Sequence, residues 1–255
     1  MSRYEKLMDR IRDGERILID GATGTEIERR GVPQLDNAWN GGGALSHPDV
    51  LRSVHEDYIR EGAEIVISNT FATHRHALRD AGVEHQFETL NRRGVELAKE
   101  ARDRMEAPDV LVAGGISYWS WSGNWPAPKD LSAGTEEEAS IMAEAGADLL
   151  MLGMMVDIDS MLVTLDAAQT SGLPVWVGLS CKANGSDAMA LLRGGLLADA
   201  LDAIKDMNVA LVCIMHTEVE DIDTCLDVVA DRAGFKAAEA RQLFERQRAR
   251  VSARR

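Results

Sequence analysis

The chain has few cysteines, few aromatic residues and a deficit of basic residues. Three of its 255 residues are cysteine, an odd number in no paired pattern, which argues against the disulfide framework of a small secreted protein. Acidic residues outnumber basic ones by 42 to 28. The net charge of -14 argues against binding to nucleic acid or to anionic membranes, which both attract an excess of Lys and Arg. Small molecules are therefore the expected partners.

Long apolar runs are also missing. No stretch approaches the roughly 20 apolar residues that a membrane span needs, and the first 20 residues lack the apolar segment of a secretion signal. With the few cysteines, these features predict a cytoplasmic protein. Hydrophobic residues make up 45% of the chain and charged residues 27%, which is typical of a folded domain.

Short apolar runs alternate with amphipathic stretches along the chain. Each run ends in small or polar residues, and glycine often precedes the next run, as at the end of a helix. This alternation predicts parallel βαβ units in one α/β domain. The predicted strands cover residues 16–20, 64–68, 110–114, 148–152, 174–179 and 209–215.

The predicted fold is an α/β barrel of the TIM type that lacks its last two strands. A dinucleotide-binding sheet is disfavoured because the sequence has no GxGxxG motif followed by an acidic residue at the next strand. The barrel is assigned to residues 1–231, and residues 232–255 form a basic, helix-prone tail that is either a solvated helix or a non-native, altered end. If the barrel is truncated, its unpaired edge strands predict a homo-oligomer or an unstable protein.

The loop after the first predicted strand combines a carboxylate with small residues. Asp20 is followed by Gly21, Ala22 and Thr23, whose backbone can approach a ligand closely. Because ligands of α/β barrels lie at the carboxyl ends of the strands, this loop is a candidate binding site. The alternative is that Asp20 and Thr25 only cap the following helix.

Polar residues also follow the second predicted strand. Asn69 and Thr70 offer hydrogen bonds to a ligand in the same region. His74 and His76 come next, and residues two apart do not share a helix face, so a metal pair is not expected there.

Three tryptophans follow the third predicted strand, in a chain poor in aromatic residues. Trp119, Trp121 and Trp125 either wall an apolar pocket or form an oligomer contact. Near the ends of the fifth and sixth strands, Cys181, Cys213 and His216 are possible zinc ligands, although buried structural cysteines are the commoner case.

Taken in order, these strand ends resemble the homocysteine S-methyltransferase family, from about residue 17 to residue 229. The order and spacing of the first two motifs are fairly specific. The matching segments are "DGATGTEIERRG" at 20–31, "SNTFATHRHAL" at 68–78, "VAGGIS" at 112–117, "EAGADLLMLGMM" at 144–155 and "LPVWVGLSC" at 173–181.

The resemblance implies a barrel in which zinc is held by three cysteines, one after the sixth strand and two in a Gly-Gly-Cys-Cys-Gly motif at the eighth. Zinc would lower the thiol pKa of homocysteine. The resemblance also implies that Asp20 and the backbone of residues 21–24 contact the amino acid, with Asp20 pairing with its ammonium group, and that Asn69 and Thr70 line the same pocket.

The sequence departs from this family pattern in three places. The sixth-strand cysteine position falls at Met215, with Cys213 two residues earlier, and the Gly-Gly-Cys-Cys-Gly motif is absent. A glutamate that often follows the fourth strand in the family is replaced by Gly153. The chain is therefore interpreted either as a truncated or altered member, or as a diverged branch that uses Cys181, Cys213 and His216.

Three functions follow from these observations. The favoured one is transfer of a methyl group from a small methyl donor to a thiol amino acid, in the manner of methionine biosynthesis, with the Trp loop receiving a cationic donor. The alternative is a catalytically inactive, metal-free barrel that binds a small amino acid or acts as an assembly protein. A metal hydrolase that uses the histidines is a third hypothesis, although no strand carries an HxH motif.

Overall fold

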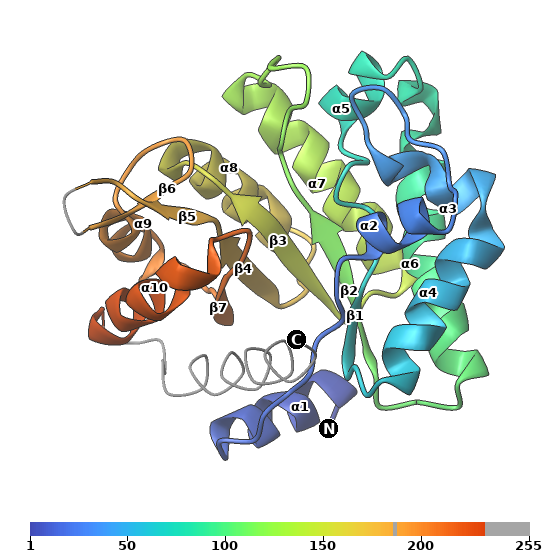
Figure 1. Cartoon of the computed structure of the whole chain (residues 1–255), viewed down its shortest axis with the longest axis horizontal. Helices are drawn as coiled ribbons and strands as arrows, with labels where there is room; N and C mark the ends of the chain where they lie inside the picture. The colour runs from blue at the N-terminus through green and yellow to red at the C-terminus, as the bar shows by residue number, and fades with distance from the viewer. Residues whose placement is uncertain (186–187, 233–255) are drawn as a thin grey trace.

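A curled sheet of parallel strands forms the centre of the molecule (Figure 1). The computed structural model describes residues 1–185 and 188–232. The strand order is β1-β2-β3-β4-β7, and neighbours in this order are neighbours in the sequence apart from an inserted hairpin. The strands are β1 (Ile65–Ile67), β2 (Leu111–Ile116), β3 (Leu149–Met155), β4 (Val175–Leu179) and β7 (Leu211–Ile214).

Helices alternate with the strands, as the sequence pattern predicts. Their ends follow local capping chemistry: Asp157 accepts a hydrogen bond from the Ser160 backbone N–H at the start of α8, and Gly146, with φ 92°, ends α7. The helices are α1 (Arg3–Arg12), α2 (Thr23–Arg29), α3 (Gly43–Ser46), α4 (Pro48–Arg60), α5 (Arg75–Asp80), α6 (Phe87–Arg104), α7 (Pro128–Ala145), α8 (Ile158–Gln169), α9 (Leu197–Ile204) and α10 (Val219–Asp231), with short 3-10 turns at Asn40–Gly42 and Glu84–Gln86.

The sheet is an open half-barrel, which confirms the predicted α/β barrel architecture with strands missing. The first predicted strand, residues 16–20, is reduced to a single parallel bridge between Ile19 and Ile65 of the three-residue strand β1. The structure adds an antiparallel hairpin of β5 (Cys181–Ala183) and β6 (Met189–Leu191), which the sequence analysis missed. The predicted tail lies outside the described residues from residue 233 onward.

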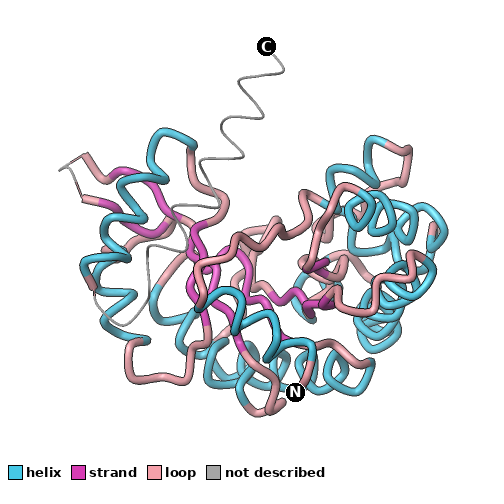
Figure 2. The backbone as a smooth tube through the Cα atoms, turned by 90° about the horizontal axis from the view of Figure 1, so that it is seen from below, coloured by secondary structure: helices cyan, strands magenta, loops and turns pink. Residues whose placement is uncertain are grey.

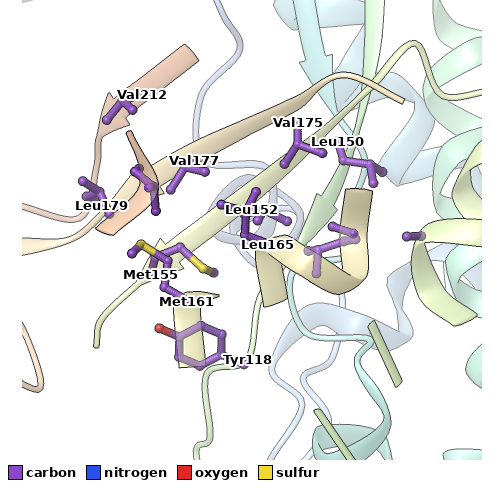
Figure 3. Packing of buried hydrophobic residues seen from close by; sticks show 14 of the residues in the cluster. Tyr118, Leu150, Leu152, Met155, Met161, Leu165, Val175, Val177, Leu179 and Val212 are labelled. Carbon is purple, nitrogen blue, oxygen red and sulfur yellow. The ribbon is translucent and has the colours of Figure 1, made fainter. Parts of the chain in front are cut away.

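The two faces of the sheet are both apolar, because helices cover one face and the barrel interior lies on the other. Alternate residues of β3 show this division: Leu150 and Leu152 pack outward with α8, whereas Leu149 and Met151 pack inward. Figure 3 shows the outward cluster, in which Leu165 lies beside the strands.

The inward face is closed at the start of the strands by α1. Leu7 and Ile11 of this helix pack with the inward residues of the sheet, and Trp176 Nε1 donates a hydrogen bond to Tyr4 Oη at 3.1 Å. Figure 2 shows the strands in the middle of the molecule with helices around them. Within the described part of the chain, no helix is both long and apolar enough for a membrane crossing. The opposite ends of the strands carry the polar residues.

Candidate functional site

Asp20 is the most unusual residue at the carboxyl ends of the strands. Its Oδ2 accepts a hydrogen bond from the Ile67 backbone N–H at 2.8 Å. Its Oδ1 is shielded from solvent and has no hydrogen-bond partner among the described residues. Burial raises the pKa of the Asp20 carboxyl to about 8, and the hydrogen bond from Ile67 offsets only part of that rise. An unpartnered buried carboxylate oxygen is costly, so it marks a place where a cationic group would be stabilised.

The structure answers the question of whether the first loop only caps a helix. α2 begins at Thr23, and its N-cap residue, Ala22, makes no side-chain capping bond. Asp20 is instead bound to β1, so the capping alternative is wrong for this residue. Gly21 is exposed, and a Cβ atom there would lie 2.8 Å from Tyr58 Oη, so a larger residue would collide with α4.

A chain of hydrogen bonds joins this loop to the end of β1. Asn69 Nδ2 donates to the Asn40 carbonyl at 2.9 Å, and Asn40 Nδ2 donates to the Gly24 carbonyl at 2.7 Å. Asn40 Oδ1 is buried without a partner among the described residues, so it is a second free acceptor. Nothing in the sequence patterns identified Asn40, although it opens the glycine run at 41–43.

Thr70 holds two strand ends together. Its hydroxyl donates to the Gly115 carbonyl at 2.6 Å, lies 2.8 Å from the Ser68 hydroxyl, and is fully buried. Thr70 therefore fixes the end of β1 against β2. Asn69 instead joins the end of β1 to the loop that carries Asn40. Any contact of either residue with a ligand remains a prediction.

An aromatic group surrounds Phe71, directly after these residues. The rings of Trp39 and Trp121 meet the Phe71 ring edge-on, at centroid distances of 6.5 and 6.0 Å. His216 stacks on Phe71 at 5.9 Å. We call these four residues the Phe71 cluster. The sequence analysis singled out Trp121 and His216, but missed Trp39 and Phe71 because they lie on separate loops.

The three tryptophans of the predicted Trp loop point to different places. Trp121 belongs to the Phe71 cluster, whereas Trp119 and Trp125 pack edge-on against each other at 5.6 Å. The Arg193 guanidinium lies over the Trp125 ring at 3.6 Å. Both interpretations of this loop, a pocket wall and an oligomer contact, stay predictions.

His74 and His76 contact each other, unlike the arrangement expected for two residues of one helix. His74 is the N-cap of α5 with an extended backbone, so its ring stacks on that of His76 at 3.8 Å. His76 Nε2 lies 3.1 Å from the Tyr118 carbonyl. Burial and the neighbouring ring lower the pKa of His74, and both residues are buried.

The three proposed zinc ligands do not form one site. Cys181 packs with Cys225 in the cluster on the helix side of the sheet, whereas Cys213 packs with the inward cluster. His216 is exposed at the Phe71 cluster. Burial raises the pKa of the Cys213 thiol to about 12, which disfavours the thiolate that binds zinc.

A search of residues 1–185 and 188–232 likewise finds no three His, Cys, Asp or Glu side chains placed to hold a metal ion. The described residues do not fit zinc because the outward and inward cysteines lie on opposite faces of the sheet. This finding corrects the ligand set of Cys181, Cys213 and His216.

Met215 follows β7, at the position where the family resemblance implies a zinc-binding cysteine. Its Sδ accepts a hydrogen bond from the Met154 backbone N–H at 3.2 Å. Its side chain crosses the ends of β3 and β4, where a Cβ atom at Gly178 would lie 2.7 Å from Sδ and one at Gly153 would lie 3.7 Å from it. Phe71 Cδ2 is also 3.7 Å from that Gly153 position, so Met215 and the Phe71 cluster border the same space.

Comparisons with known proteins show what the chain is similar to. The model of the homocysteine S-methyltransferase family matches residues 17–245. Selenocysteine methyltransferase of Astragalus bisulcatus is 29% identical over 244 residues, which cover 82% of this chain and 71% of that protein. Homocysteine S-methyltransferase of Escherichia coli is 28% identical over 165 residues, which cover 59% of this chain and 53% of that protein. That alignment therefore reaches about half the length of the bacterial relative.

A solved structure shows the same fold. The oxidized form of the homocysteine methyltransferase MmuM from Escherichia coli superposes with a TM-score of 0.76 at 22% identity. The match covers 91% of this chain and 83% of that chain. The half-barrel therefore corresponds to most of a known architecture.

Proposed function

Because this chain belongs to the homocysteine S-methyltransferase family, we propose that its strand-end pocket binds a sulfur- or selenium-containing α-amino acid and transfers a methyl group to it from a small cationic donor. The relatives support this substrate class, since their names specify homocysteine or selenocysteine. The observation that carries the proposal is the buried, unpartnered Oδ1 of Asp20.

The amino acid is oriented by its ammonium group. Asp20 Oδ1 accepts one of the ammonium protons, and Asn40 Oδ1 offers a further acceptor from the neighbouring loop. The ammonium charge favours the ionised form of Asp20, so binding lowers the raised pKa of that carboxyl. Gly21 and Ala22, which follow Asp20 in the same loop, are exposed.

The methyl donor is assigned to the Phe71 cluster. A sulfonium or quaternary ammonium group is attracted to the faces of aromatic rings, and Phe71 with Trp39 and Trp121 provides three such rings. In the transfer, the amino acid sulfur forms a bond to the methyl carbon as the bond from that carbon to the donor heteroatom breaks. The bonding pair leaves with the donor, which becomes neutral, and the thiol proton passes to solvent. The pocket contributes by placing the two reactants in line.

We expect Phe71→Leu to raise the KM for S-methylmethionine about five- to tenfold, because leucine keeps an apolar side chain but loses the ring that attracts the cation. Phe71→Tyr keeps the ring and serves as the matched control, with a KM close to that of the unaltered protein. The measurement is methyl transfer to homocysteine by the full chain. An unchanged KM in Phe71→Leu would show that the methyl donor does not bind at the Phe71 cluster.

The alternative function is binding of the amino acid without catalysis. It is favoured by the positions of the cysteines. They lie in different clusters and so do not form a site that would hold a metal to activate a thiol. Calorimetry separates the two functions: binding of methionine and homocysteine with no methyl transfer from any sulfonium or quaternary ammonium donor supports the alternative, and absence of binding contradicts both.

A further inference from the structure

The residues around Gly153, at the end of β3, are apolar and polarisable. Met215 contributes its thioether, Phe71 contributes an aromatic edge, and Gly153 contributes no side chain. The charged group of the proposed pocket, Asp20, is already assigned to the ammonium group of the ligand. None of these three described residues carries a positive charge that could pair with a thiolate, and an unpaired anion in an apolar site is strongly disfavoured.

Met215 is also unsuited to the role of a zinc ligand. Zinc in proteins is held by cysteine thiolate, histidine nitrogen or carboxylate oxygen, and thioethers instead suit softer metals. The sulfur of Met215 already accepts the Met154 N–H, and its side chain is wedged against Gly178. Displacing it would cost both contacts.

We propose that the pocket binds its amino acid without zinc, and that Met215 is the specificity-determining residue that selects an uncharged sulfur side chain, the neutral thiol of homocysteine or the thioether of methionine, over a thiolate. This inference rests on the proposed binding of an amino acid at Asp20. The thioether of the ligand packs against Met215 and Phe71, because sulfur makes favourable contacts with both methionine and aromatic rings. A thiol bound in the same place ionises less readily than in water, where a thiol has a pKa of about 8.5, because the apolar lining disfavours the anion.

The test uses the full chain after dialysis against a chelator, with zinc content measured by elemental analysis and binding by calorimetry. We expect far less than one zinc per chain, and the same methionine affinity with and without added zinc. Methionine should bind severalfold more tightly than homocysteine at pH 7, since its side chain buries one more methyl group.

Two variants test Met215 itself. Met215→Leu keeps an apolar side chain of similar volume, so methionine affinity should fall by less than about tenfold. Met215→Gln has similar length but places an amide beside the ligand, so methionine affinity should fall by more than in Met215→Leu. Circular dichroism of both variants checks that the fold is retained.

The outcomes are distinguishable. About one zinc per chain, with homocysteine affinity that rises when zinc is added, would overturn the inference and leave the proposed function standing. If Met215→Leu and Met215→Gln both fold and lose methionine affinity equally, Met215 does not select the side chain of the ligand. Absence of binding by either amino acid would remove the proposed function, and this inference with it.

Discussion

Replacing Asp20 by asparagine should weaken methionine binding by about 100-fold or more, because removing one partner of a buried charge pair leaves the ammonium group unpaired. Asparagine preserves the size of the side chain and can still accept the Ile67 N–H, so the loop should keep its shape. The measurement is calorimetry of the full chain at pH 8. Asp36→Asn, at an exposed position of the following loop, is the matched control and should bind normally.

The same substitution should make the ligand-free protein more stable at high pH. The folded-state pKa of Asp20 is raised from 3.8 to about 8, so its contribution to stability is fully present below pH 4 and is lost as the pH rises through 8. At pH 9 the unaltered protein holds a buried, ionised carboxylate, and Asp20→Asn removes that cost, which is on the order of a few kcal/mol. An Asp20→Asn variant that binds methionine normally, or that is less stable than the unaltered protein at pH 9, would contradict the role of Asp20 as a buried carboxylate that binds the ligand.

His55→Leu should remove a large part of the acid sensitivity of the fold. His55 of α4 is fully buried, and neither of its ring nitrogens has a hydrogen-bond partner among the described residues. Burial lowers the pKa of His55 from 6.5 to about 4. Because the folded-state pKa is depressed, this neutral histidine stabilises the fold above pH 6.5, and that stability is lost as the pH falls toward 4.

For this shift, the free energy of unfolding should drop by about 2 kcal/mol between pH 7 and pH 5 through His55 alone. Urea unfolding at both pH values measures the drop, and the drop should be smaller by that amount in His55→Leu. His85→Leu changes an exposed histidine and should leave the pH dependence intact. An equal drop in the unaltered protein and in His55→Leu would show that His55 does not titrate in this range.

Much of the fold could be predicted from the sequence because hydrophobic periodicity reflects burial directly. Strands such as β3, buried on both faces, read as continuous apolar runs, and the helices between them read as amphipathic. The first strand was predicted too long because its pairing depends on a partner of only three residues, which the run at 16–20 does not reveal. The hairpin of β5 and β6 was missed since each of its strands has three residues.

The site was only partly predictable because it depends on which side of the sheet each side chain at a strand end packs. Asp20 follows its strand directly, and its position was evident from the sequence alone. Cys181 and Cys213 also follow or end strands, yet they pack on opposite sides of the sheet. His74 and His76 were judged by helical spacing, whereas His74 precedes the helix as its cap. Phe71 contacts Trp39 and His216, which lie on loops far apart in the sequence. No rule of sequence spacing predicts such contacts.

The central claim, that the ammonium group of an amino acid is bound by the buried carboxylate of Asp20, is tested most directly by counting protons. With a pKa of about 8, Asp20 is mostly protonated at pH 7 in the free protein and must ionise when the ligand binds. Calorimetry of methionine binding at pH 7, in buffers with different ionisation enthalpies, should show close to one proton released per methionine bound. Asp20→Asn should release none. Methionine binding without proton release in the unaltered protein would contradict the account.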